Sequence, residues 1–166
     1  MRRLWLTAIA AFALDQASKL AVIHLVRLPL RGEVDVIDPL LNLRWAENRG
    51  INFGLFAHDA NAARWVLIAL ALAISAWVVH WARREGHNRW TQISAGLLVG
   101  GALGNVVDRL AYGYVADFLN MSCCGIENPY AFNVADVAIA AGAMGLVLFS
   151  GGSGQAPARK PRRKTP

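Results

Sequence analysis

Four long apolar runs, separated by polar segments, dominate the pattern of hydrophobic and polar positions along the chain. The runs cover Leu4–Val26, Trp65–Ala82, Thr91–Val107 and Phe132–Phe149. Each has about the 17–25 residues that a helix needs to cross the hydrocarbon core of a bilayer. The pattern therefore predicts an all-α polytopic membrane protein, with four transmembrane helices in a single domain of residues 1–150.

The first polar link, residues 28–63, has a different period. Polar and apolar residues alternate over Glu33–Val36 and again over Leu41–Trp45, on either side of a turn at Asp38 and Pro39. Alternation with period two around a turn predicts a small β-sheet, which we expect on the outer face of the membrane.

Glycines and apolar residues follow the expected hairpin. Gly50 and Gly54 allow close or unusual backbone geometry, and the apolar residues between 51 and 56 suit a short helix in the membrane interface. A loop anchored in lipid is the simpler alternative. Asn48 and Asn52 stand beside these glycines and could bind a peptide backbone.

Charge predicts the orientation in the membrane. The chain is 55% hydrophobic and 17% charged, more apolar than an ordinary soluble domain, and its formal net charge is +6. Basic residues gather before the first run, between the second and third runs, and in the tail: Arg2 and Arg3; Arg83, Arg84 and Arg89; Arg159, Lys160, Arg162, Arg163 and Lys164. The positive-inside rule places both termini in the cytoplasm and both longer links outside. Residues 151–166 are expected to form a disordered basic tail. Its charge is interpreted mainly as a signal of orientation; binding to anionic lipid is the alternative, and no nucleic-acid partner is expected.

The N-terminus and the cysteines allow more than one interpretation. The first 14 residues are similar to a secretory signal, but apolar residues resume after Asp15, which favours an uncleaved first helix. Cys123 and Cys124 are adjacent and match neither a disulfide framework nor a metal motif. A strained bridge and two free thiols are both compatible with the sequence, and we assign these cysteines no role.

Polar residues interrupt the first run at its centre, where Asp15, Gln16, Ser18 and Lys19 cluster. Asp15 and Lys19 are four residues apart, so they can pair on one helical face. The pair could simply lower the cost of burying two charges. Alternatively, Asp15 points into a catalytic cavity, because ionisable residues inside a membrane usually serve function.

The third run combines small residues with a polar end. Gly96, Gly100 and Gly104 are spaced four apart, which lets a neighbouring helix approach closely. Asp108 and Arg109 suit a helix end at the water boundary. Asn105 lies deeper and would need a hydrogen-bonding partner.

Two aspartates carry the candidate chemistry. Asp117 closes a polar, turn-rich stretch that is expected to be extended or to turn back towards the membrane, and Asp136 lies a few residues into the fourth run. Close carboxylates cannot both ionise easily, so such a pair could share a proton and activate water. Asn133 is three residues before Asp136, on the same helical face, and both should point inward.

These motifs resemble, in content and order, those of the lipoprotein signal peptidase (signal peptidase II) family. They are Asp15-Gln-Ala-Ser-Lys19, Asn48-Arg-Gly50 with Phe53-Gly54, Gly104-Asn105-Val-Val-Asp108-Arg109, Val115-Ala-Asp117-Phe118 and Phe132-Asn133-Val-Ala-Asp136. The resemblance covers residues from about 4 to 149 and implies an aspartyl endopeptidase of the bacterial inner membrane. Members of that family remove the signal peptide of prolipoproteins by cutting just before the cysteine that bears diacylglyceryl.

The resemblance also implies roles for residues of this chain. Asp117 and Asp136 would be the catalytic dyad. The polar support around it would be Asp15, Asn48, Asn105, Arg109 and Asn133, and the structural motif residues would be Lys19, Gly50, Gly54, Gly104 and Asp108. Arg109 would orient a carbonyl or stabilise Asp108. The chain departs from the family at Ile51 and Asn52, where small residues are usual, and in its paired cysteines.

We therefore expect a monomer that acts on diacylglyceryl prolipoprotein signal peptides, contacts membrane lipid, and needs neither a cofactor nor a metal. One rival is a small proton-coupled transporter subunit, in which Asp15, Lys19 and Asp136 would form a relay. The runs contain no inverted repeat, which speaks against that rival. The other rival is a structural membrane subunit whose buried polar residues only join helices.

Overall fold

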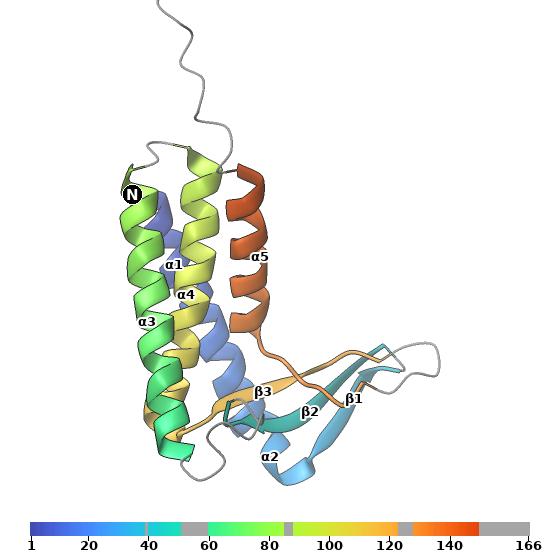
Figure 1. The fold of residues 1–166 in the computed structure, drawn as a ribbon. Helices are drawn as coiled ribbons and strands as arrows, with labels where there is room; N and C mark the ends of the chain where they lie inside the picture. The colour runs from blue at the N-terminus through green and yellow to red at the C-terminus, as the bar shows by residue number, and fades with distance from the viewer. Residues whose placement is uncertain (39, 51–59, 85–87, 123–127, 150–166) are drawn as a thin grey trace, which may run out of the picture.

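The computed structural model describes residues 1–38, 40–50, 60–84, 88–122 and 128–149. Helices stand side by side in a bundle, and a small sheet projects sideways from one end of it (Figure 1). The bundle consists of α1 (Arg2–Leu20), which continues into the π-helical η1 (Ala21–Leu25), and of α3 (Ala60–Arg84), α4 (Arg89–Tyr112) and α5 (Val134–Phe149).

Each of the four predicted apolar runs coincides, to within one or two residues at its ends or with a longer helix around it, with one of these helices. By length and composition, three helices of the described chain could cross a membrane: Arg2–Leu25, Asn61–Arg84 and Arg89–Tyr112. Val134–Phe149 is apolar but shorter, with 16 residues. It begins two residues later than the run predicted, because Phe132 bridges to Leu119 of the sheet before the helix starts.

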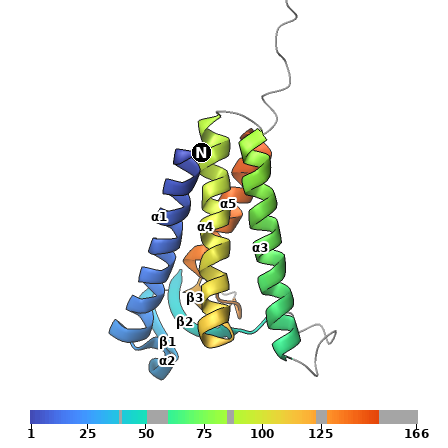
Figure 2. The same cartoon turned by 90° about the vertical axis from the view of Figure 1, so that its left-hand side faces the viewer.

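The central helix is α4, which packs against α1, α3 and α5. Figure 2 shows it between α1 and α3, with α5 behind. A Cβ atom on Gly96 would lie 2.5 Å from the carbonyl oxygen of Leu4, and one on Gly101 would lie 2.5 Å from that of Ala135. The close helix approach predicted from the small residues is thus confirmed, with α1 on one side of α4 and α5 on the other.

Both ends of the described chain meet the start of α4. The Met1 amine donates to Gln92 Oε1 over 2.9 Å, and Thr91 Oγ1 donates to the Phe149 carbonyl over 3.2 Å. The sheet lies at the opposite end of the bundle (Figure 1).

The sheet is antiparallel, in the order β1 (Glu33–Ile37), β2 (Leu41–Asn48), β3 (Val115–Asn120). A short helix, α2 (Leu28–Arg31), precedes it. The predicted hairpin of β1 and β2 is confirmed, with Glu33 opposite Arg44. The third strand was not predicted as a member of this sheet.

An apolar cluster attaches the sheet to the bundle. Val22 of η1, Leu28 of α2 and Phe118 of β3 are buried against one another, with Trp45 among the residues packed on them. Each such side chain contributes roughly 1.5–3 kcal/mol when it is fully removed from water. This cluster holds β3, and therefore Asp117, in a fixed position below the helices.

Several predictions concern residues outside the described ranges. They are the expected interfacial helix with Gly54, the departures at Ile51 and Asn52, the pair Cys123 and Cys124, and the basic tail.

Candidate active site

Asp117 lies in β3, opposite Ala46 of β2, and is 2% exposed. Its Oδ1 accepts a hydrogen bond from Asn133 Nδ2 over 2.6 Å, and its Oδ2 accepts one from Asn48 Nδ2 over 3.0 Å. The strand pairing brings Asn48 to the carboxylate, and the start of α5 brings Asn133.

Asp136 is the third residue of α5 and forms a reciprocal capping box with Asn133. The Asp136 backbone nitrogen donates to Asn133 Oδ1 over 2.9 Å, and the Asn133 backbone nitrogen donates to Asp136 Oδ2 over 3.2 Å. The other carboxylate oxygen, Oδ1, accepts from Asn105 Nδ2 over 2.9 Å. Asn105 thus has the partner that its depth required.

One residue, Asn133, touches both carboxylates and is fully buried. The loop after α4 therefore does fold back, so that Asp117 and Asp136 belong to one site. Every hydrogen bond that the two carboxylates accept within the described residues comes from an asparagine amide or from the Asn133 backbone.

The environment of Asp117 favours its protonated form. Its pKa is raised from the ordinary value of 3.8 to about 6. Burial is the largest cause, and the negative charge of Asp136 adds to it, while hydrogen bonds from Asn48 and Asn133 and the positive charge of Lys19 oppose the rise. A carboxyl group with a pKa near 6 can exchange a proton with its neighbour close to neutral pH.

A buried ion network lies behind the pair. The expected ion pair between Lys19 and Asp15 is present at 2.8 Å, and Lys19 also contacts Asp108 Oδ2 at 2.7 Å. Lys19 Nζ further donates to Asn105 Oδ1 over 3.2 Å. The lysine therefore holds the carbonyl end of the Asn105 amide, so that the nitrogen end faces Asp136.

Asp15 connects α1 to the start of α5. Its Oδ1 accepts from the Ala135 backbone nitrogen over 2.9 Å, and it forms no hydrogen bond with either aspartate of the pair within the described chain. A Cβ atom on Gly104 would lie 2.5 Å from Asp15 Oδ2, so only glycine leaves room for this carboxylate.

Asp108 corrects one expectation. A place at the water boundary was expected, but Asp108 is 1% exposed. It accepts hydrogen bonds from Gln16 Nε2 over 3.1 Å and from the Ala116 backbone nitrogen over 3.2 Å. The reason is that the chain after α4 folds back over the end of the helix and covers it. Gln16 was noted only as a polar residue, and nothing in its local sequence indicated this contact.

Of the two roles expected for Arg109, the stabilisation of Asp108 is not observed. No acid of the described chain is within 4.0 Å of its guanidinium, so it does not pair with Asp108. Instead it lines a mainly apolar groove of about 250 Å³ between α3, α4 and α5. The lining residues are Leu67, Leu70, Ala71, Ile74, Leu98, Ala102, Asn105, Arg109 and Ile139. Because Asn105 also binds Asp136, the polar end of this groove adjoins the aspartate pair.

Gly50 orients Asn48. Its backbone nitrogen donates to Asn48 Oδ1 over 3.1 Å, and its φ of +106° is one that residues with a Cβ rarely adopt. The amide oxygen of Asn48 is thereby occupied, and its nitrogen is directed to Asp117.

Comparisons of the sequence with known proteins all identify the same family. The family profile described as Signal peptidase (SPase) II matches residues 7–151. A lipoprotein signal peptidase of Methylobacterium sp. (strain 4-46) is 44% identical over 142 residues, which covers 86% of this chain and 84% of that protein. One from Aeromonas hydrophila subsp. hydrophila is 44% identical over 149 residues, covering 89% and 87%.

Solved structures of bacterial membrane enzymes share the fold. One, determined by the in meso method at 1.9 Å resolution, has a TM-score of 0.74 and 25% sequence identity, and the match covers 86% of this chain and 88% of that one. Another, at 2.3 Å resolution, has a TM-score of 0.73 and 24% identity, with 93% of both chains covered.

Proposed function

This chain belongs to the signal peptidase II family, and we propose that Asp117 and Asp136 are the catalytic pair with which it cleaves the signal peptide from lipoprotein precursors. The observation that carries this assignment is the pair of hydrogen bonds from Asn133, one to each carboxylate. The rival reading as a proton-coupled transporter subunit finds no support among the relatives, which are lipoprotein signal peptidases.

The reaction needs one proton shared between the two acids. The charged carboxylate takes a proton from a water molecule, whose oxygen attacks the scissile carbonyl, while the protonated partner donates to the carbonyl oxygen. When the tetrahedral intermediate collapses, the C–N bond breaks, the new amine receives a proton, and the acids exchange roles. The coupled acids titrate as a unit.

The asparagines keep this pair in place. Asn48, Asn105 and Asn133 hold all four carboxylate oxygens through the bonds described above, so neither side chain can turn away. Lys19, Asp15 and Asp108 act one layer further out, by orienting Asn105 and the start of α5.

The substrate is a diacylglyceryl prolipoprotein, and the groove beside the pair suits its apolar part. About 250 Å³ of mainly apolar space can hold an acyl segment or apolar side chains of the signal peptide. Arg109, at the polar end next to Asn105, would bind a substrate carbonyl and orient the scissile bond.

In the membrane, the chain would act as a monomeric single domain, residues 1–150, with all four helices spanning the inner membrane. The short α5 would begin at the active-site level. Arg2, Arg3 and Arg89 lie at the end of the bundle that carries Met1, which supports cytoplasmic termini and a site near the periplasmic face.

Asp117→Asn and Asp136→Asn test the dyad. Each should lower cleavage of a diacylglyceryl lipopeptide by at least about a hundredfold, because neither can exchange the proton. Asp35→Asn, an exposed position on β1, is the matched control and should retain activity. Size-exclusion elution in detergent checks that the variants are folded. Normal cleavage by either dyad variant would refute the assignment, and a loss of folding without a loss of activity per folded molecule would favour a structural role.

A further inference from the structure

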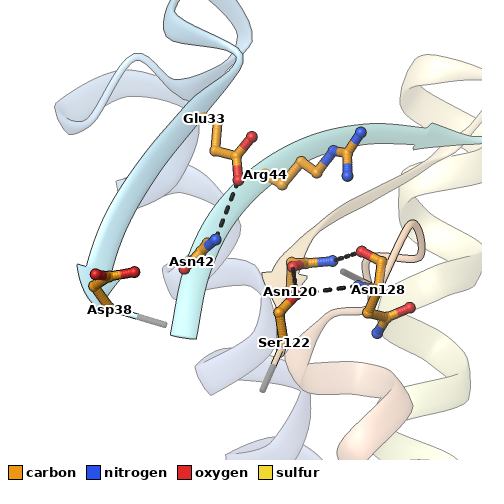
Figure 3. A pocket seen from close by; sticks show the side chains of 7 residues that line it. All are labelled: Glu33, Asp38, Asn42, Arg44, Asn120, Ser122 and Asn128. Carbon is orange, nitrogen blue, oxygen red and sulfur yellow. Dashed lines mark hydrogen bonds between the residues drawn. The ribbon is translucent and has the colours of Figure 1, made fainter. Parts of the chain in front are cut away.

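A second pocket, of about 320 Å³, lies at the far end of the sheet, where β1 ends and β2 begins. Figure 3 shows Asp38 on one side and Asn120 and Asn128 on the other. Its lining is polar and combines charged side chains with amides: Glu33, Asp38 and Arg44 with Asn42, Asn120 and Asn128.

One wall of this pocket is fixed by its own hydrogen bonds. Asn120 is 2% exposed, and its Nδ2 donates to the carbonyls of Asn128 over 2.7 Å and of Tyr130 over 2.8 Å. Ser122 Oγ donates to Asn120 Oδ1 over 3.2 Å. These bonds hold the side chain of Asn120 in place within this wall.

The charged side chains, by contrast, have free hydrogen-bonding capacity. Among the described residues, Asp38 and Arg44 have no side-chain hydrogen bond or ion pair, and the carboxylate of Glu33 accepts only from Asn42 Nδ2, over 3.2 Å. The pocket therefore offers guanidinium donors and carboxylate acceptors together. A peptide has both N–H and C=O groups and can use both kinds of partner.

The distance from the aspartate pair suggests which peptide this is. Asp117 and Asn120 are three residues apart on β3, which in an extended strand corresponds to about 10 Å. An extended polypeptide that leaves the pair along the sheet would reach the pocket after three or four residues. The signal peptide is apolar and belongs in the bilayer, so the polar pocket suits the other product.

We propose that this pocket binds the polar segment of the lipoprotein that begins about three residues after the scissile bond. The proposal rests on the proposed function, because it requires that the aspartate pair cleaves a prolipoprotein. It adds a subsite for the mature side of the substrate, with Arg44 binding peptide carbonyls and Asp38 binding peptide N–H groups or a cationic side chain.

The experiment compares two diacylglyceryl lipopeptides with the same signal sequence, one ending two residues after the scissile bond and the other ending six residues after it. The test variant is Asp38→Asn with Arg44→Gln. The control variant, Arg31→Gln with Asp35→Asn, makes the same charge changes at exposed neighbours outside the pocket. KM and kcat are measured for all three proteins in detergent micelles.

In wild type and control, the longer peptide should have a KM lower by about fivefold to tenfold, since one hydrogen bond changes affinity by about fivefold. In the test variant this advantage should disappear, with kcat unchanged. Equal KM values for both peptides in the wild type, or an undiminished advantage in the test variant, would overturn the subsite. A different outcome would be a KM increase in the test variant that appears only when the micelles contain phosphatidylethanolamine and is the same for both peptides. The pocket would then bind a lipid headgroup, and the proposal would be wrong. Failure of the wild type to cleave either peptide would refute the proposed function itself.

Discussion

Asn48 allows a sharp test of the electrostatics of the pair, because its amide donates to Asp117 and not to Asp136. This hydrogen bond favours the charged form of Asp117 and so lowers a pKa that burial and Asp136 have raised to about 6. Asn48→Ala removes the bond. The pKa of Asp117 should then rise further.

The size of the shift follows from the bond. A hydrogen bond to a charged group contributes about 1.5–3 kcal/mol, and one pKa unit corresponds to about 1.4 kcal/mol. Because the Asn48 side chain is itself exposed, water replaces part of the lost bond, and the lower value applies. We therefore expect the pKa to rise by about one unit.

The assay is the pH dependence of kcat/KM for a short lipopeptide between about pH 5 and pH 9, which reports the free enzyme. Loss of the last proton of the pair sets the alkaline limb, so raising the pKa of Asp117 moves this limb upward. The limb should lie near pH 6 in the wild type. In Asn48→Ala the alkaline limb should lie at about pH 7. The maximum of kcat/KM should be lower than in the wild type, because the Asp117 side chain has lost one of its two hydrogen bonds.

The control is Glu47→Gln, the neighbouring position on β2. Glu47 is exposed and pairs with Arg49 at 2.7 Å, without a hydrogen bond to either aspartate. Its alkaline limb should coincide with that of the wild type. A limb that stays in place or moves downward in Asn48→Ala would refute the idea that this asparagine stabilises a charged Asp117.

Two further predictions concern the layer behind the pair. Lys19→Met leaves Asp15 and Asp108 buried without their cation, so it should lower the free energy of unfolding by about 3–5 kcal/mol, whereas Arg49→Gln, which breaks the exposed pair with Glu47, should cost less than about 1 kcal/mol. Denaturation in mixed micelles measures both, and equal losses would contradict a buried network. Gly104→Ala would place a Cβ atom 2.5 Å from Asp15 Oδ2, so it should lower the free energy of unfolding by about 1–3 kcal/mol. It should also lower activity, because Asp15 binds Lys19, which in turn holds Asn105. A thermal unfolding midpoint equal to that of the wild type would show that Asp15 can move aside.

The sequence by itself determined the features that depend on local periodicity. The apolar runs, the alternating hairpin and the pairing of Asp15 with Lys19 are each encoded within a short stretch, because helices and strands repeat every few residues. The contact between Asn133 and Asp136 is local too and follows from their spacing, although Asn133 caps the helix from just before its start instead of lying on its face as predicted.

Only the tertiary structure decided which distant side chains meet. Asn48 and Asp117 are 69 residues apart in the chain, and they touch because β3 pairs with β2, which no local period encodes. The same fold-back buries Asp108 against Lys19 and leaves Arg109 to the groove, although the two are neighbours in sequence. Consecutive helical residues point in different directions, so packing assigned one to the ion network and the other to the groove.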